Sequence, residues 1–491
     1  ILDRKMSYPK NLGTKFNYLT NYSTNSVKLN MDNSITELDN ISSGARMQFT
    51  LPPNSLVDLS SFSIHAQFET TPATSAGNAT RPYYLTRNVM SMVRRLTVEI
   101  GGQTVSDIQD YNLINQIFSD YQFGIEGSSK KLLSNYDPLD KRNTIGGQQS
   151  ALSAIANANA VNLRVDRRPI CLSQFLGFLG GGAGIKYLDT QLTGTIKITM
   201  ELAPASHILW RPRPVAVDGI TAIGAAADNG NDAVIDGTYK LSSVYATIKK
   251  CSIDDGVYFA SVASALQAGI PFEYKYNHFQ TTKSNVTDGN LTMRYEIMSN
   301  SVDLALLTFY NDGRETFGEM VDSANLGSNG ETDILAANVL APKCSGKSLA
   351  LAGKQSSFSS QYFRRVGTHI DTTKFFINGE RLPQYDMKNP QCYNQSLIDF
   401  GIHDDTANGI FWGINSYETW QKYYWIASAR LSHICNDDTF VSGFNANGVP
   451  LTLSVETTAV AGAGVNKHGQ LFVMTSEVLQ VYAGRQVNRV K

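Results

Sequence analysis

Long stretches of the chain alternate apolar and polar residues with a period of two. Apolar residues occupy positions 196, 198, 200 and 202, with polar residues at 197, 199 and 201 between them. The same alternation runs through residues 47–51, 96–100 and 451–455. Because successive side chains of a strand point to opposite faces, this pattern is typical of antiparallel strands with one buried and one solvated face. The chain is therefore predicted to be an all-β protein.

Helical signals are few and short. Apolar residues between Ile108 and Tyr121 recur at spacings of three and four, which indicates an amphipathic helix. A second helix is expected between Asp254-Asp255 and Gly269. A third is expected over residues 417–429, where the preceding Asn-Ser pair supplies the start signal. Each helix is expected to lie in a connection between two strands.

Three segments of the first half return in the second half, in the same order. Residues 46–55 align without a gap on 292–301, residues 96–103 on 373–380, and residues 194–201 on 448–455. Each pair keeps its apolar positions. The middle pair ends in a glycine-containing turn such as Asn378-Gly379, which is a strong hairpin signal. We therefore predict a tandem duplication of one β-sandwich.

The length of the chain agrees with two large domains. At 491 residues it exceeds one ordinary domain of about 100–200 residues. We assign residues 1–30 to an extended N-terminal arm, 31–260 to the first β-sandwich and 261–491 to the second. Long connections rich in Gly, Ala, Asn and Thr separate the strands and are expected to carry binding surfaces.

Charge is scarce and unevenly placed. Charged residues make up 17% of the chain, below the roughly 25% usual for soluble domains, and the formal net charge is -1. This balance argues against a uniformly basic nucleic-acid-binding protein and favours surfaces covered by neighbouring molecules. The two ends are basic, and they are either solvated tails or partner-binding segments. Their basic residues are Arg4, Lys5, Lys10, Lys15, Lys28, Arg485, Arg489 and Lys491.

Two loop-like segments resemble nucleotide-binding motifs only in part. Residues 341–348 fit a relaxed phosphate-binding loop, but Pro342 removes one backbone amide and Gly353 interrupts the helix that should follow. The glycine-rich run at 175–185 lacks the GxGxxG spacing and leads into a strand. We interpret the first segment as a surface loop and the second as a flexible or closely packed connector.

Residues that could perform chemistry are scattered. The seven histidines show no metal-ligand spacing, and His65 falls on the polar side of the alternating stretch 62–68. Adjacent acidic pairs at 254–255, 404–405 and 437–438 fall at turns or helix starts, where the helix dipole favours them. We predict no catalytic, cofactor-binding or metal-binding residues, and no cofactor.

Neither the cysteines nor the apolar runs indicate secretion or a membrane anchor. The five cysteines are widely spaced and form no Cys-x-x-Cys pair, which favours free thiols in a reducing compartment. The longest apolar run, near residues 304–310, is far shorter than the ~18–20 residues needed to span a bilayer. We therefore expect a soluble protein.

The repeated segments carry a family resemblance. The strand-turn-helix units at 96–121 and 373–400, the strand at 195–202 and the polar N-terminal arm resemble the double jelly-roll major capsid proteins, in particular those of polinton-like viruses and virophages. The resemblance implies two tandem eight-stranded jelly rolls with short helices in the loops. It also implies a structural protein and not an enzyme. A homotrimer would form a pseudo-hexameric capsomer, and capsomers would tile an icosahedral shell around a DNA genome.

The resemblance further implies partners and a location. The partners are neighbouring capsomers, penton and minor capsid proteins, and the genome or an inner membrane, which the inward-facing basic termini would contact. No small-molecule substrate is expected. Such a protein is synthesised in the cytoplasm or nucleus of the host cell and resides in the shell of the virion.

Two other functions stay open on the residues alone. One is a secreted or surface carbohydrate-binding β-sandwich protein, which an upstream signal peptide or disulfides would favour. The other is a polysaccharide-active β-sandwich hydrolase. That enzyme would need two carboxylates facing each other across a cleft about 5–10 Å apart.

Overall fold

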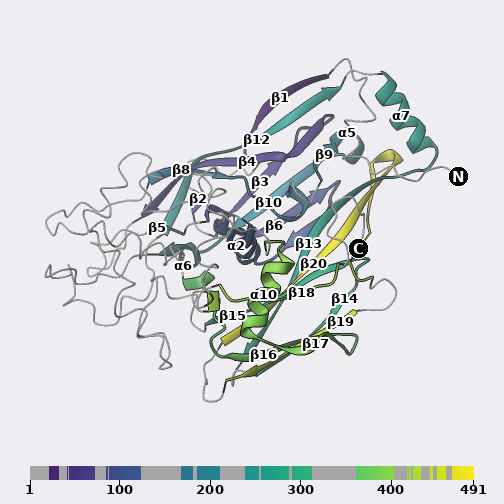
Figure 1. Cartoon of the computed structure of the whole chain (residues 1–491). Coiled ribbons are helices and arrows are strands. Elements are labelled where there is room, and N and C mark those ends of the chain that lie inside the picture. The colour runs from purple at the N-terminus through teal and green to yellow at the C-terminus, as the bar shows by residue number, and fades with distance from the viewer. Residues whose placement is uncertain are drawn as a thin grey trace, which may run out of the picture.

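The structure is a computed structural model, and strands dominate it (Figure 1), which confirms the all-β prediction. Two similar β-sandwiches lie side by side, one formed by each half of the chain. The described residues are 22–32, 41–42, 44–71, 84–86, 88–122, 167–180, 185–210, 238–253, 256–286, 290–311, 361–402, 417, 420–421, 424–432, 443–445, 451–460 and 467–490.

The first sandwich consists of two antiparallel sheets. The outer sheet has the order β1-β12-β4-β8, and the second sheet has the order β3-β10-β6-β7. The short strands β2 and β9 pair with β12 and β4, and β5 pairs with β11. The bounds are β1 Tyr22–Leu29, β2 Ile41–Ser42, β3 Arg46–Thr50, β4 Leu56–Thr71, β5 Tyr84–Leu85, β6 Val93–Ile100, β7 Gln103–Ile108, β8 Arg167–Leu172, β9 Tyr187–Asp189, β10 Ile196–Leu202, β11 Leu209–Trp210 and β12 Thr238–Ile253.

The second sandwich has the same plan. Its sheets have the orders β13-β20-β15-β18 and β14-β19-β16-β17, and the C-terminal strand β21 folds back onto β20. The bounds are β13 Phe272–Val286, β14 Leu291–Ile297, β15 Val302–Asn311, β16 Ile370–Ile377, β17 Glu380–Lys388, β18 Ala427–Arg430, β19 Leu451–Ala459, β20 Lys467–Tyr482 and β21 Gln486–Val490.

The strand order identifies each sandwich as a jelly roll. When the eight main strands of either half are numbered along the chain, both halves have one sheet of order 1-8-3-6 and a second of order 2-7-4-5. The three sequence matches fall on corresponding strands, namely β3 with β14, β6 with β16, and β10 with β19. The predicted duplication and the predicted jelly rolls are therefore confirmed.

Alternating burial explains why these segments form strands. In β10 the side chains of Ile196, Ile198, Met200 and Leu202 are at most 1% exposed, whereas the polar residues between them face outward. Each fully buried aliphatic side chain stabilises the fold by roughly 1.5–3 kcal/mol. A shift of the strand by one residue would place Lys197 and Glu201 in the core, so the register is fixed.

Positive backbone φ angles at the hairpin turns explain their glycines. Gly101 and Gly102 between β6 and β7 have φ of 57° and 85°, and Asn378 and Gly379 between β16 and β17 have φ of 50° and 87°. Glycine and asparagine tolerate this region, which a two-residue hairpin requires at both positions. The predicted Asn378-Gly379 turn is confirmed.

Helices lie in the connections, and two of the three predicted ones are confirmed. A helix follows each of these hairpins, α2 (Tyr111–Gln122) after β7 and α10 (Asn389–Asp399) after β17, and α7 (Gly256–Gln267) links the jelly rolls. The side chain of Gln391 accepts a hydrogen bond from the backbone of Lys388 (2.8 Å), which caps the start of α10. The shorter helices are η1 Val89–Met92, η3 Gly177–Leu179, α5 Thr190–Thr193, α6 Ala205–Ile208, η4 Gln361–Phe363 and η5 Ala483–Arg485.

The structure differs from the sequence expectations in two places. The helix predicted over 417–429 is wrong at its C-terminal end, because residues 427–430 form β18 and pair with β15 in the sheet. The arm was expected to reach residue 30, but residues 22–29 form β1 and pair with β12. The predicted boundary after residue 260 falls within α7, the helix that links the two jelly rolls.

Candidate functional site

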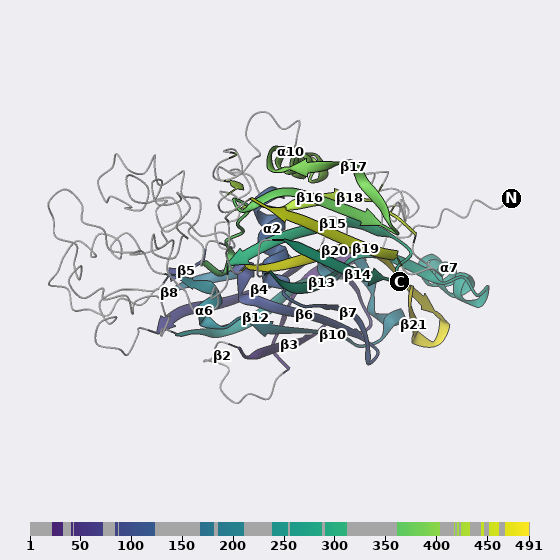
Figure 2. The same ribbon diagram turned by 90° about the horizontal axis from the view of Figure 1, so that it is seen from below.

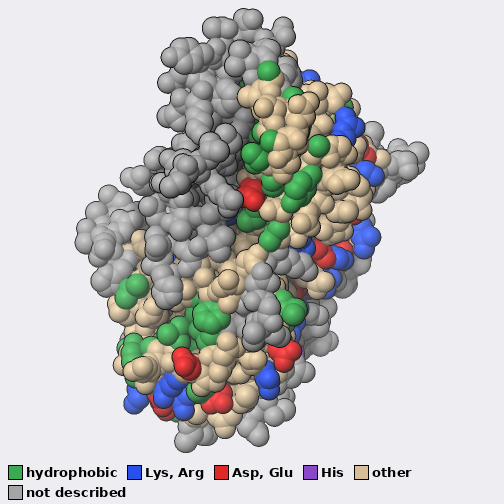
Figure 3. All heavy atoms as spheres, turned by 90° about the vertical axis from the view of Figure 1, so that its right-hand side faces the viewer, with side chains coloured by type: hydrophobic (Ala, Val, Ile, Leu, Met, Phe, Trp, Pro, Cys, Tyr) green, Lys and Arg blue, Asp and Glu red, His purple; other side chains and the backbone are tan. Residues whose placement is uncertain are grey.

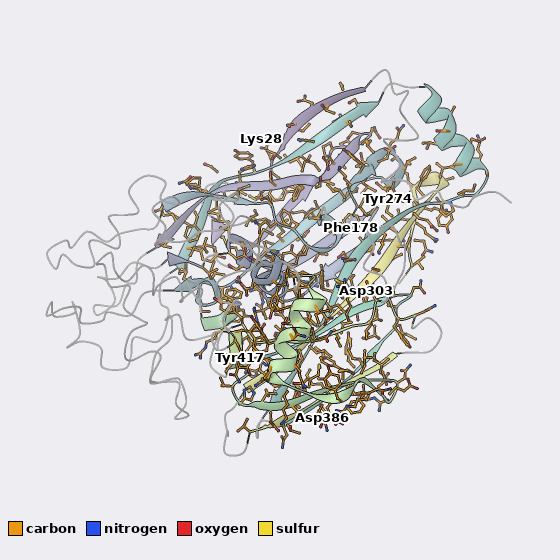
Figure 4. All side chains as sticks on the ribbon, in the orientation of Figure 1. Lys28, Phe178, Tyr274, Asp303, Asp386 and Tyr417 are labelled. Atoms are coloured by element: carbon orange, nitrogen blue, oxygen red, sulfur yellow. The ribbon has the colours of Figure 1, made fainter. Side chains whose placement is uncertain are left out.

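The two jelly rolls meet along a buried contact that we call the inter-roll seam. It is formed by α2, β7, η3 and α6 of the first jelly roll and by β13, η4 and the end of α10 in the second. Helices α2 and α10 and strand β13 lie near one another at the centre of the molecule in Figures 1 and 4. Seen from below, the two sandwiches form adjoining layers, with α10 and β17 at one edge and β2, β3 and β12 at the other (Figure 2). Buried apolar side chains form one connected cluster through both jelly rolls.

Helix α2 lies at the centre of the inter-roll seam. Every residue from Tyr111 to Tyr121 is buried, so the helix is covered on all sides. Phe118 packs edge-on against Phe279 of β13 (ring centroids 5.4 Å apart) and against Phe400, which follows α10 (5.3 Å). Tyr121 stacks on the same Phe400 ring at 4.5 Å. Aromatic pairs of this kind add about 0.5–1.5 kcal/mol each beyond area burial.

A buried ion pair crosses the inter-roll seam at the end of α2. Arg365 donates a hydrogen bond to Asp120 at 2.7 Å, and the two side chains are 1% and 5% exposed. Gln116 donates to the other carboxylate oxygen of Asp120 (2.8 Å). Nearby, the indole N–H of Trp420 donates to the hydroxyl of Tyr121 (2.6 Å), whose pKa is raised by burial.

A second charged cluster closes the other end of the inter-roll seam. Arg489 of β21 binds both carboxylate oxygens of Glu477, at 2.5 and 2.7 Å, and the Glu477 side chain is 0% exposed. The hydroxyl of Tyr276 lies 2.7 Å from Glu477 and 3.1 Å from the carbonyl oxygen of Val105 in β7. The ring of Phe178 packs edge-on against Tyr276 at 5.2 Å (Phe178 is labelled in Figure 4).

A third ion pair joins the jelly rolls where β7 leads into α2. The ammonium group of Lys283 lies 2.9 Å from a carboxylate oxygen of Asp110, and Gln470 donates to the same oxygen at 3.1 Å. Asp110 belongs to the first jelly roll, whereas its two partners belong to the second. Buried or half-buried charges that are paired in this way fix the relative position of two elements more than they add net stability.

The glycine-rich connector is closely packed where it is described. Gly177 has φ of 75°, and a Cβ atom there would lie 2.8 Å from Cδ1 of Ile108 and 3.1 Å from the carbonyl oxygen of Asn277. Only glycine therefore allows η3 to approach β13 this closely. The packed alternative for this connector is confirmed for residues 175–180, and residues 181–184 lie outside the described part.

The structure places three of the predicted basic residues, and they do not form one patch. Lys28 lies on β1 with its ammonium group 4.5 Å from the centroid of the Tyr245 ring. Arg485 donates to the carbonyl oxygen of Gln191 (3.3 Å), and Arg489 binds Glu477. The other predicted basic residues, Arg4, Lys5, Lys10, Lys15 and Lys491, lie outside the described residues.

The remaining sequence motifs give no further site among the described residues. No group of three His, Cys, Asp or Glu side chains in the described ranges is placed to hold a metal ion. Cys171, Cys251 and Cys392 form no disulfide, and burial raises the pKa of Cys392 to about 12. The loop at 341–348 and the acidic pairs at 254–255, 404–405 and 437–438 lie outside the described residues. No helix in the described part is long and apolar enough to cross a bilayer.

His65 occupies the position that the alternation predicted. It lies on the outward face of β4, where its ring stacks on Tyr245 (centroids 5.1 Å apart). Its Nε2 atom lies 3.1 Å from the hydroxyl of Ser63 and 3.3 Å from that of Thr247. Burial lowers the pKa of His65. The prediction of a strand-surface histidine is confirmed.

Two solved structures that match this chain are of viral capsids. The Faustovirus major capsid protein matches with a TM-score of 0.55 and 9% identity, over 94% of this chain and 91% of that chain. The fold is a double jelly roll. A quasi-atomic model of the PBCV-1 virus capsid matches this double jelly roll with a TM-score of 0.52 and 13% identity, over 96% of this chain and 97% of that chain. The sequence itself matches no family model and no curated protein.

Proposed function

We propose that this double jelly-roll protein is the major capsid protein of a virus. The fold supports the proposal because two solved structures that share it over more than nine-tenths of the chain are of capsid proteins. The role is then structural and involves no turnover. The protein would reside in the virion shell after synthesis in the cytoplasm or nucleus of a host cell.

The observation that carries this proposal is the equivalence of the two jelly rolls. They share one strand order in both sheets, and the ion pairs Arg365–Asp120 and Lys283–Asp110 hold them side by side. A chain with two similar lobes can give a six-lobed ring from three copies, because the copies related by a threefold axis present alternating first and second jelly rolls. We propose that this pseudo-hexameric homotrimer is the capsomer that tiles an icosahedral shell around a DNA genome.

The surface composition agrees with repeated lateral contacts. On the face at the α7 end, charged side chains are interspersed among neutral polar and apolar ones (Figure 3). Charged residues make up 17% of the whole chain, which is also a low fraction. Neighbouring capsomers, penton proteins and minor capsid proteins are the partners that we propose for such surfaces.

We further propose that the basic termini contact the genome or an inner membrane. Residues 1–21 hold Arg4, Lys5, Lys10 and Lys15 against Asp3 as the acidic residue. At the other end the charge of Arg489 is engaged by Glu477, so the C-terminal contribution comes from Arg485 and Lys491. Deletion of residues 1–21 leaves β1 in place, and it should preserve the capsomer but impair assembly around DNA; unchanged assembly would remove this role.

The oligomeric state tests the proposed function. Size-exclusion chromatography with light scattering should give a mass three times the 53.8 kDa of one chain. A stable monomer at high protein concentration would contradict the capsomer proposal.

A further inference from the structure

The surface formed by β17 and α10 of the second jelly roll is exposed, whereas the equivalent surface of the first jelly roll is buried. Helices α2 and α10 occupy the same place in their jelly rolls, each directly after the hairpin strand β7 or β17. When the two helices are aligned from their first residues, one stripe of α2 is buried and the matching stripe of α10 is exposed. The buried residues are Asn112, Leu113, Gln116 and Asp120, and their exposed counterparts are Pro390, Gln391, Asn394 and Ile398.

The hairpin strands show the same contrast. Val105 of β7 is 2% exposed, because Tyr276 of β13 covers it. Its counterpart in the aligned hairpins is Leu382 of β17, which is 37% exposed. Among the described residues, three of the seven large hydrophobic side chains that are exposed belong to β17 and α10, namely Leu382 (37%), Tyr385 (49%) and Ile398 (45%).

Strand β13, which covers β7 within the chain, corresponds to β1 of the first jelly roll, and most of the described side chains of β1 are exposed. Strand β13 is the first strand of the second jelly roll and pairs with β20, just as β1 is the first strand of the first jelly roll and pairs with β12. β13 is covered by the first jelly roll, and Tyr274, Tyr276 and His278 are buried. In β1 the side chains from Ser23 to Ser26 and that of Lys28 are exposed.

Strand register gives the residue correspondence between β1 and β13. Thr475 pairs with both Val302 and His278, and Lys250 pairs with both Val57 and Asn25. Just after the first repeated segment, Val57-Asp58-Leu59 returns in the second half as Val302-Asp303-Leu304. Val57 therefore corresponds to Val302, and Asn25 is the counterpart of His278. Two residues earlier in each strand, Ser23 is the counterpart of Tyr276.

We propose that the exposed surface of β1 in one copy of this chain binds the β17–α10 surface of a second copy, in the way that β13 binds β7 and α2 within one chain. The partner is a second copy because the inter-roll seam already shows that these two types of surface fit each other. This contact deepens the proposed function and rests on it. It predicts that Ser23 of one copy lies beside Leu382 of the next, as Tyr276 lies beside Val105.

The two surfaces lie on opposite sides of the molecule, with β1 at the top and β17 at the bottom of Figure 1. Figure 2 agrees, because α10 and β17 form one edge and β12 lies toward the other. A contact between opposite sides is head-to-tail, so each copy uses both of its surfaces and the chain of contacts either closes into a ring or continues as a filament. The surface of β1 from Ser23 to Ser26 is polar and uncharged, so it brings no unpaired charge against the apolar side chains of β17 and α10.

Single charged substitutions test this contact. Ile398→Arg and Leu382→Arg change exposed side chains, so they should fold as the parent protein does by circular dichroism. Either should weaken self-association by about a hundredfold or more, because a charge would be buried at the contact. Met298→Arg is the matched control, since Met298 is 63% exposed and lies on neither surface, and it should leave the sedimentation coefficient unchanged.

Cross-linking supplies a second measurement that does not depend on disrupting the contact. The double variant Ser23→Cys, Leu382→Cys should give covalent trimers with a short bis-maleimide reagent, whereas each single variant and the parent chain give background only. If the parent chain is a trimer but the arginine variants stay trimeric and no cross-links form, this contact is wrong and the capsid function stands. If the parent chain is a monomer, the proposed function itself is contradicted.

Discussion

Arg365 of the second jelly roll donates a hydrogen bond to Asp120 of the first across 2.7 Å, and neither side chain is more than 5% exposed. The two residues are 245 positions apart, so this pair ties the two halves of the chain together. Removing either partner of a buried ion pair leaves the other charge without compensation in a medium of low polarity. The relative position of the two jelly rolls therefore depends on both charges being present.

Replacing Asp120 by asparagine should strongly destabilise the protein. Asp120→Asn keeps the shape of the side chain but leaves Arg365 buried without a counter-charge, which costs about 3–5 kcal/mol in the free energy of unfolding. Urea unfolding followed by fluorescence measures this change. The double variant Asp120→Leu, Arg365→Met should recover much of the loss, because it removes both charges.

The control for this prediction is an exposed ion pair. Lys240 lies 3.5 Å from Glu69, with side chains 39% and 17% exposed. Lys240→Ala should change the free energy of unfolding by less than about 1 kcal/mol. If Asp120→Asn were no more destabilising than Lys240→Ala, the inter-roll seam would not depend on the buried pair.

Gly177 should not tolerate a side chain. Gly177→Ala places a methyl group 2.8 Å from Ile108 and 3.1 Å from the backbone of Asn277, in addition to straining a φ of 75°. Gly269→Ala is the matched control, because Gly269 has a φ of 74° and open space around it. Backbone strain should lower the stability of both variants by about 1 kcal/mol. Overpacking should lower the stability of Gly177→Ala by about 1–3 kcal/mol more. Equal melting temperatures for the two variants would contradict this account of η3.

The two arginines near the C-terminus should behave differently. Arg489→Gln leaves Glu477 fully buried without its cation and should cost about 3 kcal/mol or more. Arg485 is exposed, and its guanidinium donates to a backbone carbonyl, so Arg485→Gln should change stability by about 0.5 kcal/mol or less. Thermal unfolding of both variants distinguishes a structural arginine from a surface one. Similar losses for both would mean that the Arg489–Glu477 pair stabilises the protein no more than a surface contact does.

His65 should make stability depend on pH. Burial lowers the pKa of His65 below its ordinary value of 6.5, so the unfolded chain binds this proton more readily than the folded chain. The contribution of His65 is therefore fully present above that ordinary value and declines as the pH falls through it. As the pH falls from about 8 to about 5, the parent chain should lose stability relative to His65→Gln. A difference that is independent of pH would show that the His65 pKa is unchanged by folding.

Local patterns predicted the fold, and the reason is physical. Alternating burial in β10 and the φ angles of Asn378-Gly379 depend on neighbouring residues, so the sequence shows them directly. The duplication was visible because corresponding strands such as β6 and β16 face equivalent cores. The helix expected over 417–429 failed where Ala427 to Arg430 pair with β15, because sheet pairing overrides local helical periodicity.

The inter-roll seam was beyond sequence reasoning. Asp120 and Arg365 are ordinary charged residues in the sequence, and nothing near either one indicates a partner 245 positions away. The sequence near Glu477 likewise shows no sign of its partner Arg489, although the Glu477 side chain is 0% exposed. Arg489 lies in a basic end for which the sequence leaves a solvated tail and a partner-binding segment both open, and the structure places it in an ion pair within the chain. Long-range charge pairs depend on the packing of whole domains, which local patterns do not contain.

Single-particle electron microscopy of the purified protein shows whether three copies form the proposed capsomer. A trimeric capsomer should appear as a particle with a hexagonal outline and threefold symmetry, in which two slightly different lobes alternate around the ring. The β17–α10 surface of each copy should face β1 of the next. A monomer, a twofold dimer or an open filament as the dominant species would contradict the account.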